Sequence, residues 1–159
     1  MGYAVMGIVL LFLIPTIKGA IYYPSSDQQI ADMLTLAKLT KQDKVVDIGS
    51  GDGRVVAALA AEAGQVDGIE LNPLLVWYSR WKYARTYPNT QFMVKNLWLT
   101  NFSKYNVIVL FGMTYIMADL ERKLLKELRP GTRVIANSFP FPHWKHERKQ
   151  GGVYLYRKE

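Results

Sequence analysis

The sequence has no cysteine and only two histidines, His143 and His146. The lack of cysteine excludes disulfide bonds, thiol nucleophiles and thiolate metal sites. Two histidines cannot supply the three or four nitrogen ligands of a zinc centre, so we expect no metal cofactor. The 159 residues are half hydrophobic, which is enough for one domain with a substantial core.

Acidic residues are also in the minority. The chain has 20 lysines and arginines against 13 aspartates and glutamates, a net charge of +7. A basic surface of this kind is either simply solvated or attracts acidic partners such as nucleic acid or anionic lipid. No arginine-rich block or nucleic-acid motif accompanies the charge, so we do not expect nucleic acid as the partner.

The first 17 residues, MGYAVMGIVLLFLIPTI, contain no charged side chain. A helix of this length spans about 25 Å, and extension to Tyr23 reaches the roughly 30 Å of a bilayer core. We therefore predict a membrane anchor at residues 1–23 and a folded domain at 24–159. A docked apolar helix and a signal peptide are the alternatives, although no basic residue precedes the run. All lysines and arginines follow it, which predicts a cytoplasmic domain, with a soluble cytoplasmic protein as the alternative.

Strand and helix patterns alternate from residue 24 onwards. A capping box from Ser26 to Gln29 predicts the start of a helix that ends near Thr40. Five apolar strands are predicted at 44–48, 65–71, 91–95, 106–111 and 133–137, and further helices at 53–63, 73–86 and 115–128. The stretches HWKHERK and VYLYRKE around Gly151 and Gly152 predict a terminal hairpin. The expected fold is α/β: a Rossmann-like, doubly wound, mostly parallel sheet with a C-terminal antiparallel hairpin, preceded by an apolar N-terminal helix.

The first predicted strand runs into a glycine turn in VVDIGSGDGRVVAALA, residues 45–60. Ligands of doubly wound sheets bind at the carboxyl ends of the strands, and glycines allow the backbone to approach them closely. The dinucleotide fingerprint needs Gly or Ala where Arg54 stands, and no P-loop pattern follows. Asp47 and Asp52 would repel a pyrophosphate. The turn therefore favours a cationic or zwitterionic nucleoside.

Glu70 ends the second predicted strand, in GIELNP. It follows the glycine turn at about the spacing at which an acid accepts hydrogen bonds from ribose hydroxyls. An ordinary exposed acid is the alternative explanation. Together with the glycine turn, Glu70 favours S-adenosylmethionine, whose sulfonium is positive and whose ammonium group needs an acceptor.

Several segments together resemble one family of class I S-adenosylmethionine-dependent methyltransferases. The segments are YYPSS, VVDIGSGDGR, GIELNP, KNLW and NSFPFPHW, within residues 22–157. They are similar to the protein-lysine methyltransferases that modify the ATP synthase c-subunit and the adenine nucleotide translocase, and to prokaryotic relatives. The resemblance implies methyl transfer to a lysine ε-amine of a protein, with a membrane protein as one candidate. The alternatives are a methyltransferase for a small molecule or nucleic acid, and an inactive cofactor-binding scaffold.

The resemblance also implies which residues contact the cofactor. Asp47 and the glycines would line its methionine end, Glu70 its ribose, and Asn96 and its neighbours its adenine. Core packing is the alternative role for Trp98. The implied cofactor-binding residues are Tyr23, Pro24, Ser25, Asp47, Gly49, Ser50, Gly51, Asp52, Glu70, Leu71, Asn72, Asn96, Leu97 and Trp98.

The segment FGMTY follows the fourth predicted strand, where amino-methyltransferases meet the acceptor nitrogen. The N-P-P-Y type of motif, which indicates nucleobase or glutamine amides, is missing. We predict that Tyr115 or Phe111 lies at the acceptor channel, although Tyr115 could simply begin the next helix. The predicted opposite wall is Pro140, Phe141, Pro142 and Trp144.

Overall fold

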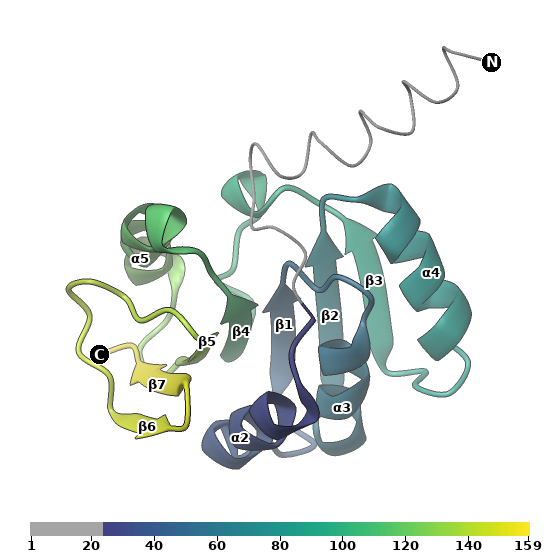
Figure 1. Ribbon diagram of the computed structural model, residues 1–159, viewed down its shortest axis with the longest axis horizontal. Coiled ribbons are helices and arrows are strands. Elements are labelled where there is room, and N and C mark those ends of the chain that lie inside the picture. The colour runs from purple at the N-terminus through teal and green to yellow at the C-terminus, as the bar shows by residue number, and fades with distance from the viewer. Residues whose placement is uncertain (1–23) are drawn as a thin grey trace, which may run out of the picture.

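The structure is a computed structural model that describes residues 24–159. Residues 1–23 lie outside the described residues, and with them the predicted anchor, the predicted N-terminal helix and Tyr23. The described chain forms one seven-stranded sheet with helices on both faces (Figure 1). The strands are β1 (Lys44–Ile48), β2 (Gln65–Glu70), β3 (Thr90–Val94), β4 (Val107–Phe111), β5 (Arg133–Asn137), β6 (Arg148–Gln150) and β7 (Val153–Arg157). The helices are α2 (Asp27–Ala37), α3 (Arg54–Glu62), α4 (Pro73–Tyr83), α5 (Thr114–Glu127) and the 3₁₀ turn η1 (Leu97–Leu99).

The strand order is β3-β2-β1-β4-β5-β7-β6. Strands β1 to β5 are parallel, whereas β7 runs antiparallel to β5 and β6 antiparallel to β7. This confirms the predicted Rossmann-like, mostly parallel sheet with antiparallel C-terminal strands. The order reverses between β1 and β4, so the carboxyl end of β1 lies at the topological switch point, where such sheets bind ligands.

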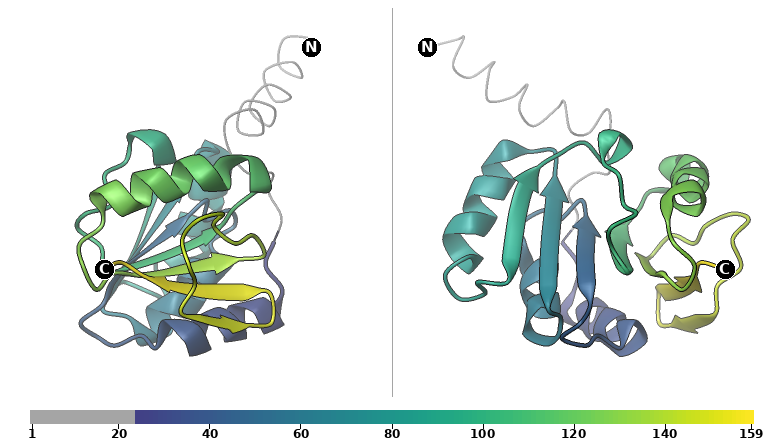
Figure 2. Two further views of the ribbon diagram at one scale, coloured as in Figure 1. Left: turned by 90° about the vertical axis from the view of Figure 1, so that its left-hand side faces the viewer. Right: turned by 180° about the vertical axis from the view of Figure 1, so that it is seen from behind.

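Two hydrophobic cores cover the two faces of the sheet. Helices α2, α3 and α4 pack on one face, over side chains such as Val45 and Val109. Helix α5 packs on the other face, over Val46 and Ile108. Figure 2 shows the sheet between α5 on one side and α2 with α3 on the other. Adjacent β1 residues serve opposite cores because side chains alternate along a strand, and burial on both faces explains the unbroken apolar runs.

Helix α2 begins as predicted and ends earlier than predicted. The Ser26 side chain accepts from Gln29 N, and the Gln29 side chain accepts from Ser26 N, which completes the capping box. The helix stops at Ala37 because Lys38 takes a left-handed φ of 46°. Arg133 donates to the carbonyls of Ala37 and Lys38 and so caps the end of the helix.

The first strand of the terminal hairpin is much shorter than HWKHERK. Only Arg148–Gln150 pairs with β7, and residues 138–147 form a loop. The buried Glu121 of α5 causes this, because its Oε2 accepts from the backbone nitrogens of His143 and Trp144 at 2.9 and 3.2 Å. These two residues are therefore tied to α5 and cannot extend the sheet.

Candidate cofactor site at the glycine loop

The loop that follows β1 is fastened to the end of β2. Gly49 N and Ser50 N both donate to the carbonyl of Ile69, at 2.9 and 3.0 Å. Gly68 makes this approach possible, since a Cβ at Gly68 would lie 2.9 Å from Ser50 Oγ and from Val56 Cγ2. Gly68 was not singled out from the sequence, although a glycine inside an apolar strand is a recognised signal of close backbone approach.

The loop glycines all have a left-handed backbone, but their surroundings differ. Gly49, Gly51 and Gly53 have φ values of 78°, 52° and 82°. A Cβ at Gly53 would lie 2.8 Å from Ser79 Oγ and 2.9 Å from Phe92 Cε1, whereas a Cβ at Gly49 would meet nothing within 4 Å. Gly53 is therefore required for packing. Gly49 borders open space at the carboxyl end of β1, which leaves its backbone accessible to a ligand.

Three carboxylates surround this loop. Glu70 Oε2 accepts from Gly51 N at 3.1 Å, and its Oε1 accepts from Asn72 N at 2.8 Å. Asp47 is buried at the end of β1. Burial raises the pKa of Asp47 to about 7, and the negative charges of Glu70 and Asp52 add to this effect. The structure thus brings together the predicted residues of the loop and of the β2 end, in a site that favours a cation.

Asp52 has a different role from the other two carboxylates. Its Oδ2 pairs with Arg54 Nη2 at 2.8 Å and also accepts from Arg54 Nε at 3.0 Å. Arg54 therefore neutralises part of the acidic charge of the loop. The residue that departs from the dinucleotide fingerprint is thus used to hold the loop, next to the first turn of α3.

The two predicted asparagines both cap helices. Asn72 Oδ1 accepts from Leu74 N at 3.0 Å and starts α4, where Leu71 precedes it half-buried. Asn96 Oδ1 accepts from Trp98 N at 2.9 Å and starts η1. Both lie directly after the carboxyl end of a strand, as the adenosine role requires. Leu97 and Trp98 are half-buried against the core on the α5 side. For Trp98 this agrees with core packing, the alternative to a role in cofactor binding.

The predicted N-terminal segment is attached to the end of β5. Ser25 is buried, and its Oγ accepts from Asn137 Nδ2 at 3.2 Å, while Pro24 is exposed. Ser138 has a left-handed φ of 68°, and its Oγ donates to Asn137 Oδ1 at 3.2 Å. Neither Asn137 nor Ser138 was predicted from the sequence. Strained backbone of this kind is concentrated at functional sites.

The predicted acceptor residues lie on both sides of the start of α5. Phe111, at the end of β4, makes an edge-to-face contact with Phe139 at 5.8 Å between ring centroids. Tyr115 lies in the first turn of α5 and is 60% exposed. Phe139, next to the predicted wall residues, is thus one neighbour of Phe111.

The neighbours of Phe139 have other roles. Phe141 is buried and stacks on Trp144 at 5.5 Å and against Tyr156 at 4.9 Å. These rings belong to the core on the α5 side, and Pro140 and Pro142 are exposed on either side of Phe141. The predicted wall of Pro140, Phe141, Pro142 and Trp144 stays a prediction, and Phe139 adjoins it.

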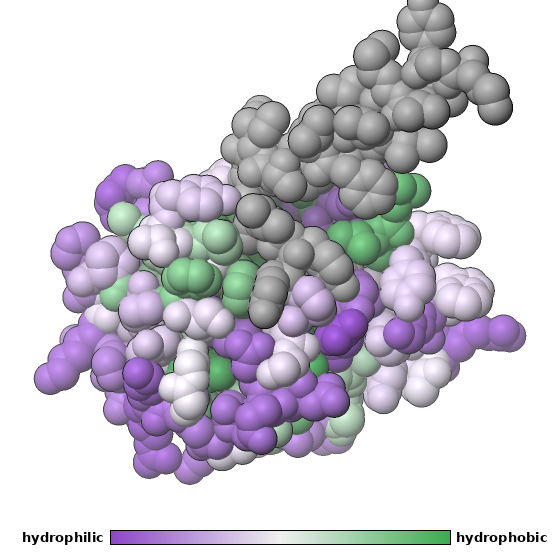
Figure 3. All heavy atoms as spheres, in the orientation of Figure 1, coloured by the Kyte–Doolittle hydropathy of each residue, from purple (hydrophilic) through white to green (hydrophobic). Residues whose placement is uncertain are grey.

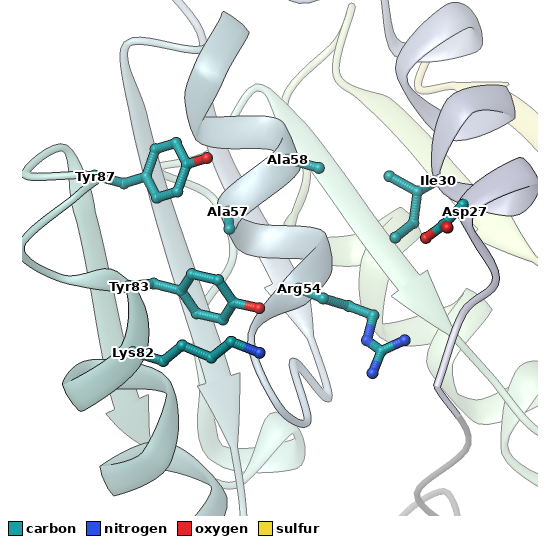
Figure 4. Close-up of a pocket in the computed structure, with 8 residues that line it drawn as sticks. All are labelled: Asp27, Ile30, Arg54, Ala57, Ala58, Lys82, Tyr83 and Tyr87. Atoms are coloured by element: carbon teal, nitrogen blue, oxygen red, sulfur yellow. The ribbon is translucent and has the colours of Figure 1, made fainter.

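A separate hollow of about 410 Å³ lies on the face covered by α2, α3 and α4 (Figure 4). Its lining residues are Asp27, Ile30, Arg54, Ala57, Ala58, Lys82, Tyr83 and Tyr87. None of the loop glycines lines it, nor do Asp47 and Glu70. It shares only Arg54 with the glycine loop and is distinct from the predicted cofactor site.

Residues 24–159, the described part of the chain, were searched for two features: a cluster of metal ligands and a membrane-spanning helix. No group of three or more His, Asp or Glu side chains in this range is arranged to hold a metal ion. Among the helices of the same range, none has the length and apolar character needed to cross a bilayer.

A family profile decides the classification of the chain. Residues 47–148, from Asp47 of the glycine loop to the first residue of β6, match the ANTKMT methyltransferase domain. The chain belongs to the ANTKMT methyltransferase family. The family match spans the glycine loop, Glu70, both capping asparagines and the Phe111–Phe139 pair, and so confirms the predicted resemblance.

Individual relatives of this ANTKMT-family domain include protein-lysine methyltransferases. It is 46% identical over 125 residues to the ATP synthase c-subunit lysine N-methyltransferase of Xenopus laevis, covering 77% of this chain and 55% of that protein. It is 30% identical over 130 residues to a protein-lysine N-methyltransferase of Saccharolobus islandicus, covering 77% and 79%. The chain thus spans about half the length of the Xenopus relative.

A solved structure supports the same fold. The crystal structure of an RNA methyltransferase from Salinibacter ruber, in complex with S-adenosyl-L-homocysteine, superposes with a TM-score of 0.77 at 30% identity. The superposition covers 86% of this ANTKMT-family domain and 92% of that chain.

Proposed function

We propose that this domain transfers a methyl group from S-adenosylmethionine to the ε-amine of a lysine in a protein. The observation that carries the proposal is the open backbone at Gly49, flanked by the carboxylates of Asp47 and Glu70. The family membership and the names of the relatives support the same reaction.

The residues at the loop fit S-adenosylmethionine. A positive sulfonium and an ammonium group would relieve the repulsion between Asp47 and Glu70, which a phosphate would increase. Glu70 uses one lone pair of each oxygen on backbone donors, and a carboxylate offers about four in all. Its remaining lone pairs can accept the two ribose hydroxyls.

The mechanism that we propose depends on positioning and desolvation. S-adenosylmethionine supplies a methyl group on a positively charged sulfur, which is a good leaving group. An attacking lysine must be neutral, although its ordinary pKa is about 10.4. The apolar edge formed by Phe111 and Phe139 favours the neutral amine by removing water from it. No general base is required from the chain for the displacement itself.

We further propose that residues 1–23 anchor the protein in a membrane, with residues 24–159 in the cytoplasm. The uncharged run at 1–17 and the position of every lysine and arginine after it support this arrangement. Relatives are named for lysines of the ATP synthase c-subunit and of the adenine nucleotide translocase. An acceptor lysine on a membrane-associated protein is therefore the substrate that we propose.

The test is methyl transfer by the purified protein, residues 1–159. The enzyme is incubated with methyl-labelled S-adenosylmethionine and a membrane extract, and labelled proteins are digested and sequenced by mass spectrometry. We expect label on lysine side chains of a small number of proteins. An extract without labelled protein would contradict the proposal, and cofactor binding without any turnover would favour an inactive scaffold.

RNA is the second candidate acceptor. The Salinibacter ruber structure is titled an RNA methyltransferase, and the net charge of +7 suits a polyanion. The labelling experiment distinguishes the two acceptors. Label that survives protease and is lost on nuclease treatment identifies RNA, whereas the reverse identifies protein.

A first variant tests the ribose role of Glu70. We expect Glu70→Gln to raise the dissociation constant of S-adenosylmethionine roughly tenfold or more, because hydrogen bonds to a charged group contribute about 1.5–3 kcal/mol each. Isothermal titration calorimetry measures this. Glu62→Gln, an exposed residue at the end of α3, is the matched control and should bind normally. Equal affinity of the two variants would contradict the ribose role.

A further inference from the structure

Helix α4 carries apolar side chains on both of its faces. The inner face buries Val76, with the small side chain of Ser79 beside the glycine loop. On the opposite side Leu74, Trp77 and Trp81 are 46%, 66% and 70% exposed. Their spacing of three and four residues places them on one face of the helix.

The Tyr78 ring lies 6.2 Å from that of Trp81 and joins the same surface. Leu74, Trp77, Tyr78 and Trp81 are called the aromatic face of α4 below. The face contains two of the four tryptophans of the chain. Contiguous exposed apolar side chains of this kind mark contact surfaces, whereas isolated ones are ordinary.

The charged residues of α4 and of the segment that follows it all have one sign. No aspartate or glutamate occurs between Glu70 and Asp119, a range that contains all of α4. Lys82 Nζ lies 5.3 Å from the ring centroid of Tyr78 and 5.0 Å from that of Tyr83. Exposed Arg85 follows on the next turn. Figure 3 shows the side of the molecule over α4 as pale spheres of intermediate hydropathy next to purple, hydrophilic ones.

We propose that the aromatic face of α4 lies in the headgroup layer of an anionic lipid bilayer. Tryptophan and tyrosine prefer this layer, because their rings are apolar at one end and form hydrogen bonds at the other. A lysine or arginine near an anionic surface contributes about 1 kcal/mol of attraction. The face combines both features, on a helix whose inner side is fixed to the sheet.

The beginning of the described chain favours the same partner. The uncharged run at residues 1–17 is separated from Pro24 only by residues 18–23. Six extended residues reach about 20 Å. A bilayer that held the run would therefore lie close to the domain. The aromatic face would then be a second contact, which fixes how the domain is turned relative to the membrane.

A second copy of the chain is a poorer occupant. Two copies of a face that is flanked by Lys82 and Arg85, and by no aspartate or glutamate of the same helix, would meet with charge of the same sign on both sides. Like charges across an interface oppose association. A protein partner at the aromatic face is the remaining alternative, and the experiment below distinguishes it from a bilayer.

The experiment uses the full-length chain with a single spin label, which is simple because the sequence has no cysteine. The label is placed by Ala84→Cys, at the exposed end of α4, or by Lys126→Cys, exposed on α5 across the sheet. Each protein is added to vesicles of phosphatidylcholine, with or without phosphatidylglycerol. Accessibility of the label to a water-soluble nickel reagent and to oxygen reports its depth.

We expect a severalfold loss of nickel accessibility at position 84 in vesicles with phosphatidylglycerol, and no change at position 126. Adding Trp77→Ala and Trp81→Ala should remove the effect, although the anchor would still bring the chain to the vesicles. Because both tryptophans are exposed, the double variant should keep its fold. Circular dichroism provides the control for this. Methyl transfer plays no part in this readout, so it is independent of the proposed activity.

Three results would overturn the proposal. The first is equal accessibility at positions 84 and 126 in anionic vesicles. The second is an unchanged signal after both tryptophans are replaced. The third is a dimer in light scattering, or a stable protein partner, that is lost with the same two substitutions.

Discussion

Asp47→Asn is expected to weaken binding of S-adenosylmethionine strongly and to stabilise the ligand-free protein above the pH of about 7 at which Asp47 titrates. Folded Asp47 keeps its proton up to a pH of about 7, whereas its pKa in the unfolded chain is about 3.8. Between these values the folded state binds one proton more than the unfolded state, so stability falls as pH rises. Asparagine has nearly the same shape and does not titrate, so the variant escapes this loss.

In the proposed complex, the same substitution removes the negative charge that would face the cationic end of the cofactor. Loss of one partner of a buried charge pair costs about 3–5 kcal/mol, so affinity should fall roughly 100-fold or more. The wild-type protein should itself bind more weakly as pH falls below 7, because Asp47 becomes neutral. Calorimetry between about pH 5.5 and 8, which brackets the pKa of Asp47, measures this, and the variant should show a flatter profile.

Asp67→Asn is the control for Asp47→Asn. Asp67 is a fully buried carboxylate on β2 that accepts from Tyr105 OH at 2.6 Å, away from the glycine loop. This variant should lose stability and keep its affinity for S-adenosylmethionine. If Asp47→Asn bound the cofactor as well as the wild-type protein does, the cationic site would be disproved.

Gly53→Ala is expected to lower the stability of the domain by about 3 kcal/mol, the sum of a left-handed alanine and an overpacked core. Its Cβ would lie within 2.9 Å of Ser79 and Phe92. For a chain of this size the melting temperature should fall by roughly 6–12 °C. Gly49→Ala has a similar φ, but its Cβ enters open space, so the loss should be only about 1–2 kcal/mol.

Cofactor affinity should rank the two alanine variants in the opposite order from stability: Gly49→Ala should lose more affinity than Gly53→Ala. Gly49→Ala should stay folded at room temperature. It should lose affinity for S-adenosylmethionine, because its methyl group would occupy the space beside the backbone that the ligand needs. Gly53→Ala should bind normally at temperatures where it is folded. Thermal unfolding with and without cofactor measures both effects. A Gly49→Ala variant with wild-type affinity would show that the ligand does not approach this backbone.

Local patterns predicted most of the fold because they depend on neighbouring residues. The capping box at Ser26 and Gln29 and the apolar β1 could be identified from the sequence for this reason. The end of α2 could not, since it depends on Arg133, which is far along the chain. Residues 1–23 lie outside the described residues, so the membrane anchor remains a prediction.

The candidate site was predicted unevenly for a similar reason. Asp47 and Glu70 follow strands, and the switch point brings the ends of neighbouring parallel strands together. The ring contact between Phe111 and Phe139 could not be predicted, because the left-handed turn at Ser138 that precedes Phe139 has no signature in a serine. The bond from Asn137 to Ser25 joins residues too distant for any local pattern.

Glu121 joins two segments that lie far apart in the sequence. By holding His143 and Trp144 it fastens the loop after β5 to α5, the helix that begins next to Tyr115. One buried carboxylate therefore joins α5 to the loop that carries Phe139. The separation of these two segments beside the proposed acceptor site would then be set by Glu121, a side chain in the core, before any substrate arrives.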